Sequence, residues 1–328
     1  MSYEQEKQVA IEAALTAAKL CEQVRQEQVT EAMEKSDKSP VTVADLGSQA
    51  VICRALAMAF PDDLVVGEED ASQLRQPEMA DQLNRVSHYV KSVVGDATPD
   101  QVLDWIDRGN SQIGGRYWTL DPIDGTKGFL RQDQYAVALA LVELGEVKLG
   151  VLVCPALPVS PYQPDGEKGV LFVAVRGQGA TMVPISGGEP QPIQVTKADS
   201  QEAMRFVESV ESGHGDHSRQ DAVAKAVGIT SPSLRMDSQA KYGAVASGRA
   251  SLYLRLPSPK SPDYREKIWD HAAGTIVVEE AGGRVTDMYG KALNFSLGAK
   301  LSDNQGVIVS NGVIHDTVLD ALRETASV

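Results

Sequence analysis

LDPIDGTKGF, at residues 120–129, places two aspartates, Asp121 and Asp124, three residues apart and directly after the apolar run YWTL at residues 117–120. The run predicts the end of a buried strand, where two carboxylates repel each other unless positive charge lies between them. Hard divalent cations such as Mg²⁺ take oxygen ligands, and the proline between the acids stiffens the turn, so both carboxylates and the Ile123 carbonyl can face one ion. The stretch therefore predicts a divalent metal between the acids.

The residues after the second aspartate predict an anion next to that metal. Gly125 lets the backbone pass close to a neighbouring group. Thr126 can begin a helix, and the free N–H groups of a helix N-terminus point at an anion. We therefore expect a phosphate that is bound to the metal.

The flanking sequence predicts helices followed by hairpins in the first half of the chain. Apolar residues at helical spacing from Ile11 to Cys21 predict one helix, and a second runs from about residue 44 to Pro61, which ends it. LVVG at residues 64–67 predicts a short strand. The two predicted hairpins turn at Gly145-Glu146 and at Gly177-Gln178-Gly179.

The second half alternates strand-like and helix-like runs, which indicates an α/β arrangement. The strands are expected near residues 205–207, 252–254 and 307–309, and the helices near 218–227, 240–248, 268–281 and 314–325. A stretch rich in Gly and Pro at residues 185–195 predicts a boundary between domains 1–190 and 191–328. We expect an α+β / α/β fold, with an antiparallel sheet in the N-terminal part and a smaller α/β C-terminal part.

Composition limits the class of protein. The 328 residues are 42% hydrophobic and 23% charged, which is typical of a globular protein, and no apolar run approaches the length of a membrane span. The N-terminus lacks the features of a signal or transit peptide, and three scattered cysteines favour the cytoplasm. We expect buried thiols, with a Cys21–Cys53 bridge as the alternative.

The net charge of −14 argues against nucleic acid as a partner, because duplex binding normally needs a basic surface. A phosphorylated small molecule remains compatible with this charge if metal ions compensate locally. We expect a monomer that binds no membrane.

Acidic residues stand at four predicted element ends: Asp45, Glu68-Glu69, the pair Asp121 and Asp124, and Asp270. Each of these acids has a purely structural alternative, which is hardest to sustain for Asp121 and Asp124 in their Gly-Thr loop. Asp45 lies three residues after Thr42, which is the spacing of a capping box. The acidic run at 68–70 is also compatible with a solvated surface, and Asp270 with a helix cap. One shared metal site would explain all four positions at once.

Three motifs resemble those of the inositol monophosphatase superfamily of magnesium-dependent, lithium-sensitive phosphatases: GEED at 67–70, LDPIDGTKGF at 120–129 and IWDHAAG at 268–274. DSQAKYG at 237–243 and YREKIWDHAAG at 264–274 further resemble the 3′(2′),5′-bisphosphate nucleotidase branch. The resemblance implies a layered sandwich of alternating helices and sheets. It also implies removal of the 3′-phosphate from adenosine 3′,5′-bisphosphate (PAP) to give AMP, a step that clears PAP during sulfur assimilation.

The resemblance assigns roles residue by residue. It implies two or three Mg²⁺ ions per site, with ligands from the metal-binding domain 1–190 and from Asp270 in the nucleotide-contacting domain 191–328. Asp45 would orient and deprotonate the attacking water, with Thr126 as its hydroxyl partner at the phosphate. The implied metal ligands are Glu68, Asp121, the Ile123 carbonyl, Asp124 and Asp270. The implied substrate contacts are Thr126, His214, Ser238, Lys241, Arg255 and Asp270, with His217 as the alternative to His214.

Other functions remain open at this point. Haloacid-dehalogenase-type phosphatases also combine Asp with Asp-Gly-Thr, but their spacing is D-x-D, whereas the spacing here is D-x-x-D. Inositol polyphosphate 1-phosphatase or inositol monophosphatase activity is the alternative within the superfamily. A non-catalytic nucleotide sensor is the alternative outside enzymes. Cleavage of the sulfated nucleotide PAPS also stays open.

Overall fold

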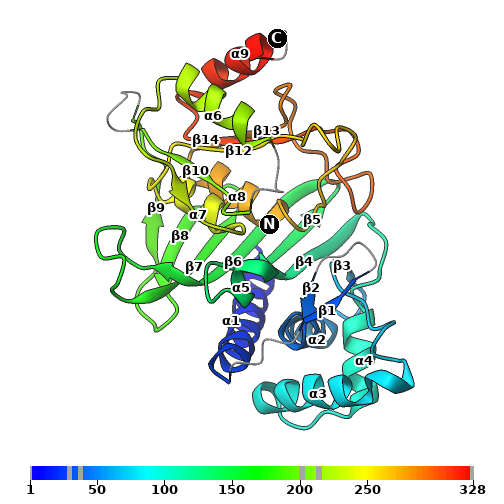
Figure 1. The fold of residues 1–328 in the computed structure, drawn as a ribbon. Coiled ribbons are helices and arrows are strands. Elements are labelled where there is room, and N and C mark those ends of the chain that lie inside the picture. The colour runs from blue at the N-terminus through cyan, green and yellow to red at the C-terminus, as the bar shows by residue number, and fades with distance from the viewer. Residues whose placement is uncertain (1, 28–31, 36–39, 199–203, 212–215, 326–328) are drawn as a thin grey trace.

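The computed structural model describes residues 2–27, 32–35, 40–198, 204–211 and 216–325. Layers of helices and sheets alternate through the molecule, from α1 and α2 at one end to α6 and α9 at the other (Figure 1). This arrangement is the layered sandwich that was expected.

The first layer is helical. It contains α1 (Glu4–Gln26), α2 (Val43–Ala59), α3 (Ala80–Val94) and α4 (Pro99–Asp107), with the short η1 (Pro77–Met79) before α3. Thr42 caps α2, and the helix ends before the proline at position 61, because proline lacks the N–H that continued helical bonding needs. Both predicted helices are confirmed. β1 (Ala32–Glu34) and β2 (Pro40–Thr42) pair in a small antiparallel ribbon before α2.

The second layer is a seven-stranded sheet in the order β3-β4-β5-β6-β7-β8-β9. Its strands are β3 (Leu64–Gly67), β4 (Arg116–Asp124), β5 (Ala136–Glu143), β6 (Glu146–Pro158), β7 (Lys168–Val175), β8 (Gly179–Pro184) and β9 (Gln191–Ile193). β3 and β4 are parallel, and the other neighbours are antiparallel. Both predicted hairpins are confirmed. Leu144 and Gly145, with φ of 51° and 79°, form the tight turn between β5 and β6.

Side chains of β5 alternate between two hydrophobic cores. Val137, Leu139 and Leu141 belong to the core shared with α1 and α2, whereas Ala138 and Ala140 belong to the core on the other face. That second core contains α7 (Ala240–Ala246) and α8 (Ala272–Glu280), which form the third layer. The small alanines let these helices approach the sheet closely.

A five-stranded sheet in the order β11-β10-β12-β14-β13 forms the fourth layer. Its strands are β10 (Phe206–Glu208), β11 (Leu234–Arg235), β12 (Leu252–Arg255), β13 (Arg284–Thr286) and β14 (Val307–Ser310). The outer layer contains α6 (His217–Ala226) and α9 (His315–Thr325). The expected strands and helices of the second half are therefore present.

Two local predictions are corrected. The acids of the quoted stretch were expected in a loop, but β4 continues through Asp124, with a shift of register between Asp121 and Asp124 that bulges the strand. The bulge keeps strand pairing and still turns both acids toward the sheet edge. The helix expected from residue 268 begins only at Ala272, so Asp270 precedes it.

Three further observations bear on the remaining expectations. The thiols of Cys21, Cys53 and Cys154 are free and buried, so the alternative of a Cys21–Cys53 bridge is wrong. The division at residue 190 stays a prediction, and β9 lies just beyond it, paired with β8. Among the described residues, no helix combines the length and apolar character that crossing a membrane requires.

Candidate active site

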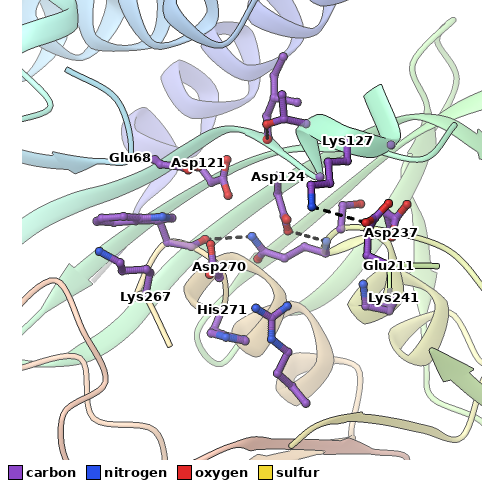
Figure 2. A pocket seen from close by; sticks show the side chains of 18 of the residues that line it. Glu68, Asp121, Asp124, Lys127, Glu211, Asp237, Lys241, Lys267, Asp270 and His271 are labelled. Carbon is purple, nitrogen blue, oxygen red and sulfur yellow. Dashed lines mark hydrogen bonds and ion pairs between the residues drawn. The ribbon is translucent and has the colours of Figure 1, made fainter. Parts of the chain in front are cut away.

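A cavity of about 440 Å³ opens where β3 and β4 end and where segments of the second half approach them. It collects nearly every site residue that the sequence singled out within the described ranges. Those lining it are Glu68, Asp121, Ile123, Asp124, Thr126, Ser238, Lys241, Arg255 and Asp270. Figure 2 shows the labelled acids Glu68, Asp121, Asp124 and Asp270 around this one space. The sequence predicts that these acids converge, and the structure places all four around the same cavity.

Parallel pairing of β3 with β4 brings the first two acids together. Gly67 lies opposite Leu120, and the Glu68 N–H donates to the Leu120 carbonyl at 3.1 Å. Glu68 and Asp121 are the next residues on the two strands. Because parallel strands end at the same edge of a sheet, their carboxylates enter the cavity side by side.

Asp121 has the chemical character of a metal ligand. Its side chain is 2% exposed, and its Oδ1 atom has no hydrogen-bond partner within the part of the chain that the structure describes. Burial, and then the charges of Glu68 and Asp124, raise the pKa of Asp121 well above its usual range. An ionised carboxylate in such surroundings is costly unless a cation binds it. This orphaned oxygen fits a divalent ion.

The other two aspartates are partly compensated by cations of the second half. Burial raises the pKa of Asp124, while Lys241, the Gln239 N–H and Arg255 oppose the rise. Burial and the charge of Asp124 raise the pKa of Asp270 well above its usual range. The cluster therefore keeps an excess of negative charge even with its neighbouring cations.

Asp45 does not line the cavity, and its carboxylate takes part both in the capping box of α2 and in a hydrogen bond with Thr126. The capping box is present, since the Thr42 N–H donates to Asp45 Oδ2 at 2.7 Å and the Asp45 N–H donates to Thr42 Oγ1 at 3.4 Å. Thr126 Oγ1 donates to the other carboxylate oxygen, Oδ1, at 3.0 Å. The structural interpretation of Asp45, as part of a capping box, is therefore confirmed, and its role at the attacking water stays a prediction. Burial raises its pKa to about 6.

The turn after β4 depends on a glycine. Gly125 has φ of 86°, and a Cβ at this position would lie 3.1 Å from the Cβ of Ser238. α5 (Thr126–Leu130) begins at the next residue, as expected. Ser238 itself has φ of 68°, a left-handed conformation that is rare for residues other than glycine and concentrates at functional sites.

Lys241 and Arg255 bring positive charge to the cavity. Lys241 is 2% exposed, its Nζ lies 5.1 Å from the centre of the Tyr253 ring, and burial lowers its pKa to about 8. Arg255 Nε donates to Glu266 at 3.2 Å. Neither cation forms a direct ion pair with the four acids among the contacts found in the described residues, so both can also face a bound anion.

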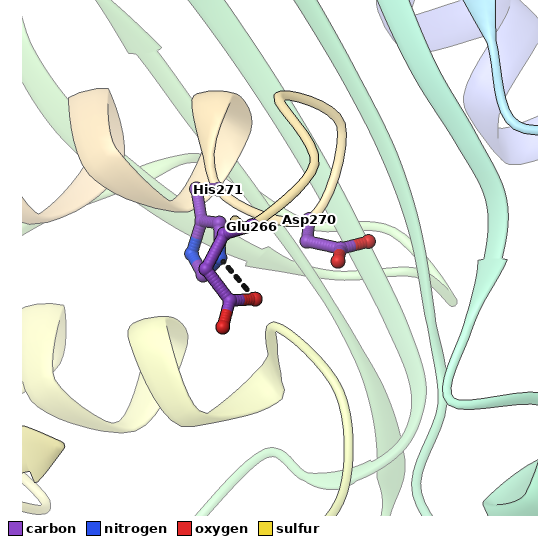
Figure 3. A group of neighbouring side chains, drawn as sticks. All are labelled: Glu266, Asp270 and His271. Atoms are coloured by element: carbon purple, nitrogen blue, oxygen red, sulfur yellow. Dashed lines mark hydrogen bonds and ion pairs between the residues drawn. The ribbon is translucent and has the colours of Figure 1, made fainter. Parts of the chain in front are cut away.

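Glu266, Asp270 and His271 form a compact group whose ligand atoms lie within 4.8 Å of one another (Figure 3). Both imidazole nitrogens of His271 are already engaged, Nδ1 with the Tyr242 hydroxyl at 2.7 Å and Nε2 with Glu266 at 3.2 Å. Although burial alone would raise it, Arg255 and His271 lower the pKa of Glu266 to about 2. We interpret Glu266 and His271 as residues that hold the segment around Asp270 in place, and we do not interpret the three residues as a second metal site.

The structure adds residues that the sequence did not single out. Lys35 Nζ lies 2.9 Å from Glu68 and 2.6 Å from Glu69. Lys267 lines the cavity with its Nζ 5.0 Å from the centre of the Trp269 ring. Lys127 pairs with Glu211 at 3.6 Å on the other rim. The spacing of residues in the sequence does not predict these contacts. The ion pairs of Lys35 and Lys127 join segments far apart in the chain, and the contact of Lys267 with Trp269 depends on the direction of the two side chains.

The predicted histidine contact lies outside the described residues, since these do not include His214. The alternative, His217, is the first residue of α6, and both of its ring nitrogens contact residues that precede it in the chain. Its Nδ1 lies 3.3 Å from Glu208, and its Nε2 lies 3.1 Å from the Glu211 carbonyl oxygen. His217 does not line the cavity.

Comparison with known proteins places the chain among phosphatases. A profile of the inositol monophosphatase family matches residues 2–327. The chain is 43% identical over 350 residues to the 3′(2′),5′-bisphosphate nucleotidase of Emericella nidulans, with 99% of each chain covered. It is 42% identical over 347 residues to that of Schizosaccharomyces pombe, with 100% of this chain and 97% of the other covered.

Among solved structures, an inositol monophosphatase from Anabaena has the same fold, with a TM-score of 0.62 at 22% identity over 99% of this chain and 97% of that chain. The expected inositol-monophosphatase-like fold is thereby confirmed. The haloacid-dehalogenase alternative is wrong, because the matching family spans the whole described chain. The sequence relatives and the shared fold agree with the cluster of acids around the cavity, and the chain belongs to the inositol monophosphatase family.

Proposed function

We propose that this chain is a magnesium-dependent 3′(2′),5′-bisphosphate nucleotidase, which removes the 3′-phosphate from PAP to give AMP and phosphate. The names of its full-length relatives support this activity, and its family is metal-dependent. The observation that carries the proposal is the cluster of acids around one cavity, with the buried and orphaned Asp121 Oδ1 among them. A cytoplasmic location and a monomeric state stay predictions.

Glu68, Asp121, the Ile123 carbonyl, Asp124 and Asp270 would hold the Mg²⁺ ions, two or three per site. All five residues line one cavity, and their donor atoms are the oxygens that Mg²⁺ prefers. The charges of Glu68, Asp124 and Asp270 all raise the pKa of Asp121, so Asp121 lies close to the other three acids. This central position would suit a ligand shared between ions. When bound, the ions neutralise the phosphate charge and activate a water for attack.

Asp45 and Thr126 would steer the attacking water. Asp45 can accept a proton near neutral pH, because its pKa of about 6 is close to the operating range of a general base. Asp45 does not line the cavity itself, but its hydrogen bond with Thr126 Oγ1 would let it take a proton from a water at the place where the phosphate would bind. As the water oxygen bonds to phosphorus, its proton passes by way of Thr126 Oγ1 to Asp45. The bond from phosphorus to the 3′-oxygen breaks, and the leaving 3′-oxygen takes a proton from a solvent water.

Lys241 and Arg255 would hold the rest of the nucleotide. A bisphosphate needs a second anion grip that an inositol monophosphate does not. Both cations line the cavity, and Figure 2 shows Lys241 across it from Glu68. Thr126, Ser238 and Asp270 would complete the substrate contacts within the described residues. His214 remains part of this proposed set.

Steady-state kinetics test the proposal directly. We expect kcat/KM for PAP to exceed that for inositol 1,4-bisphosphate and inositol 1-phosphate, and EDTA to abolish turnover. Parallel assays with PAPS would show whether the sulfated nucleotide is also cleaved. A preference for the inositol phosphates would replace the nucleotidase proposal with the alternative activity, and turnover that is independent of added metal would contradict the metal site.

A further inference from the structure

Two buried glutamines contact the segments that carry the acid cluster. Gln49 is on α2 and is 0% exposed, and Gln239 directly precedes α7 and is 1% exposed. Neither was singled out by a motif as a metal ligand or a substrate contact. A buried amide must find hydrogen-bond partners, and the partners of these two lead to the acids.

Gln49 holds the turn that carries Glu68. Its Oε1 accepts from the Glu69 N–H at 3.1 Å, and its Nε2 donates to the Glu69 carbonyl at 2.5 Å. Nε2 also donates to the Ile106 carbonyl at 2.9 Å. The amide therefore fixes the backbone one residue after Glu68 on both its donor and its acceptor side.

Two glycines make room for this amide. A Cβ at Gly67 would lie 2.6 Å from Gln49 Oε1, and a Cβ at Gly109 would lie 2.4 Å from Gln49 Nε2. The two glycines are themselves joined, since the Gly67 N–H donates to the Gly109 carbonyl at 2.8 Å. The end of β3 is thus shaped around the Gln49 side chain.

Gln239 connects the other two acids. Its backbone N–H donates to Asp124 Oδ2 at 2.6 Å, a bond drawn as a dashed line in Figure 2. Its side chain brackets Asp270, because Nε2 donates to the Trp269 carbonyl at 2.9 Å and Oε1 accepts from the Gly274 N–H at 3.0 Å. One residue therefore sets the separation of the β4 acid from the segment before α8.

Glutamine suits this position for an electrostatic reason. Its amide offers a donor and an acceptor without net charge. A lysine or arginine here would compete with a bound cation, and a glutamate would add to a cluster that is already strongly negative. Neutral amides can fix the backbone around the acids while the negative charge stays available to a metal.

We propose that Gln49 and Gln239 are positioning residues of the divalent-cation site, which hold the Glu68 turn and the Asp124–Asp270 pair at the separation that the ions require. The inference rests on the metal site of the proposed function. Outer residues that orient metal ligands typically contribute about 10–100-fold to metal affinity or activity. Their loss should act on metal affinity before it acts on the fold.

Gln49→Met and Gln239→Met test the inference, because methionine keeps the length of the side chain and removes both hydrogen-bonding groups. Gln220→Met is the matched control, since Gln220 is a buried glutamine of α6 that does not line the cavity. Mg²⁺ binding to the full chain without substrate is measured by isothermal titration calorimetry, and thermal unfolding is measured in EDTA. Gln49→Asn and Gln239→Asn, which keep a neutral amide but shorten its reach by one methylene, replace any methionine variant that does not fold.

We expect the two site variants to bind Mg²⁺ about 10–100-fold more weakly than wild type, with saturating Mg²⁺ restoring much of the kcat, and the control to bind as wild type does. Unchanged Mg²⁺ affinity in both site variants would overturn the inference, as would an equal loss in Gln220→Met. Asp124→Asn separates this failure from that of the proposed function. If wild type binds no Mg²⁺, the metal site itself is refuted. If only Asp124→Asn loses binding, the metal site stands without the glutamines.

Discussion

Thr126 Oγ1 donates a hydrogen bond to Asp45 Oδ1 at 3.0 Å across a separation of 81 residues. The bond ties the first turn of α2 to the first residue of α5 at the edge of the cavity. Asp45 therefore serves the helix cap with one carboxylate oxygen and the cavity with the other. Catalytic and structural effects of this residue can be separated, because they depend on different oxygens.

Asp45→Asn should lower kcat by about 10²–10⁴-fold, since the amide cannot accept a proton from the attacking water. KM for PAP should change little, because Asp45 does not line the cavity. The acid limb of the wild-type pH–rate profile should report the ionisation of the base, and it should disappear in the variant. Thermal unfolding monitors the cap, and Thr42→Ser, which keeps the capping hydroxyl, is the control. A variant with near wild-type kcat would exclude Asp45 as the base.

Asp121→Asn should stabilise the metal-free protein and abolish its response to Mg²⁺. Removing one charge from the buried cluster relieves repulsion from Glu68 and Asp124, by about 1–3 kcal/mol in the free energy of unfolding. Wild type should instead gain about 2.7 kcal/mol when Mg²⁺ is at 100 times its Kd. Urea unfolding in EDTA and in Mg²⁺ measures both effects. Equal Mg²⁺ stabilisation of the two proteins would remove Asp121 from the ligand set.

The metal-free protein should lose stability as pH rises above about 4, through pH 6 and beyond. Asp45, Asp121, Asp124 and Asp270 have folded-state pKa values above their ordinary ones, so the folded state binds more protons than the unfolded state in this range. Stability then falls with rising pH, because its slope follows the difference in bound protons. The measurement is the free energy of unfolding from pH 5 to 8 in EDTA. Asp121→Asn should show a shallower slope than wild type, which isolates the cluster from other titrating groups, and identical slopes would argue against it.

Lys241→Ala should discriminate between substrates with one and two phosphates. We expect kcat/KM for PAP to fall about 10–100-fold, the cost of losing a charged hydrogen bond, while that for adenosine 3′-phosphate changes much less. Lys127→Ala is the matched lysine control, because Lys127 is an exposed lysine at the cavity rim that pairs with Glu211. An equal fall for both substrates would show that Lys241 does not grip the second phosphate.

Millimolar lithium should inhibit turnover of PAP, as expected for a member of a lithium-sensitive superfamily. Li⁺ is a small hard cation that shares the preference of Mg²⁺ for carboxylate oxygens. Initial rates at fixed PAP and Mg²⁺ are compared in lithium and potassium chloride of equal ionic strength. Full activity in lithium would set this chain apart from the superfamily in that property.

Much of the architecture could be predicted from the amino-acid sequence because it depends on local patterns. Helical spacing from Ile11 to Cys21 marks α1, and turn residues at Gly145 and Gly177 mark the two hairpins. The acid motifs stand at the ends of predicted elements, and parallel pairing of two strands brings such ends to the same edge of a sheet. Even so, the extension of β4 through Asp124 was missed, because a bulge depends on the pairing partner and leaves no periodic signal.

The sequence alone determined which residue types meet in the site, and therefore its chemistry of carboxylates, a hydroxyl and cations. Only the tertiary structure decided how these residues are held. The contacts that hold them are the hydrogen bond between Thr126 and Asp45, the ion pairs of Lys35 with Glu68 and Glu69, and the side-chain hydrogen bonds of Gln49 and Gln239. The physical reason is the range of the interactions. Hydrophobic periodicity and turn chemistry act over a few neighbouring residues, whereas these hydrogen bonds form only after packing has brought remote segments within about 3 Å of each other.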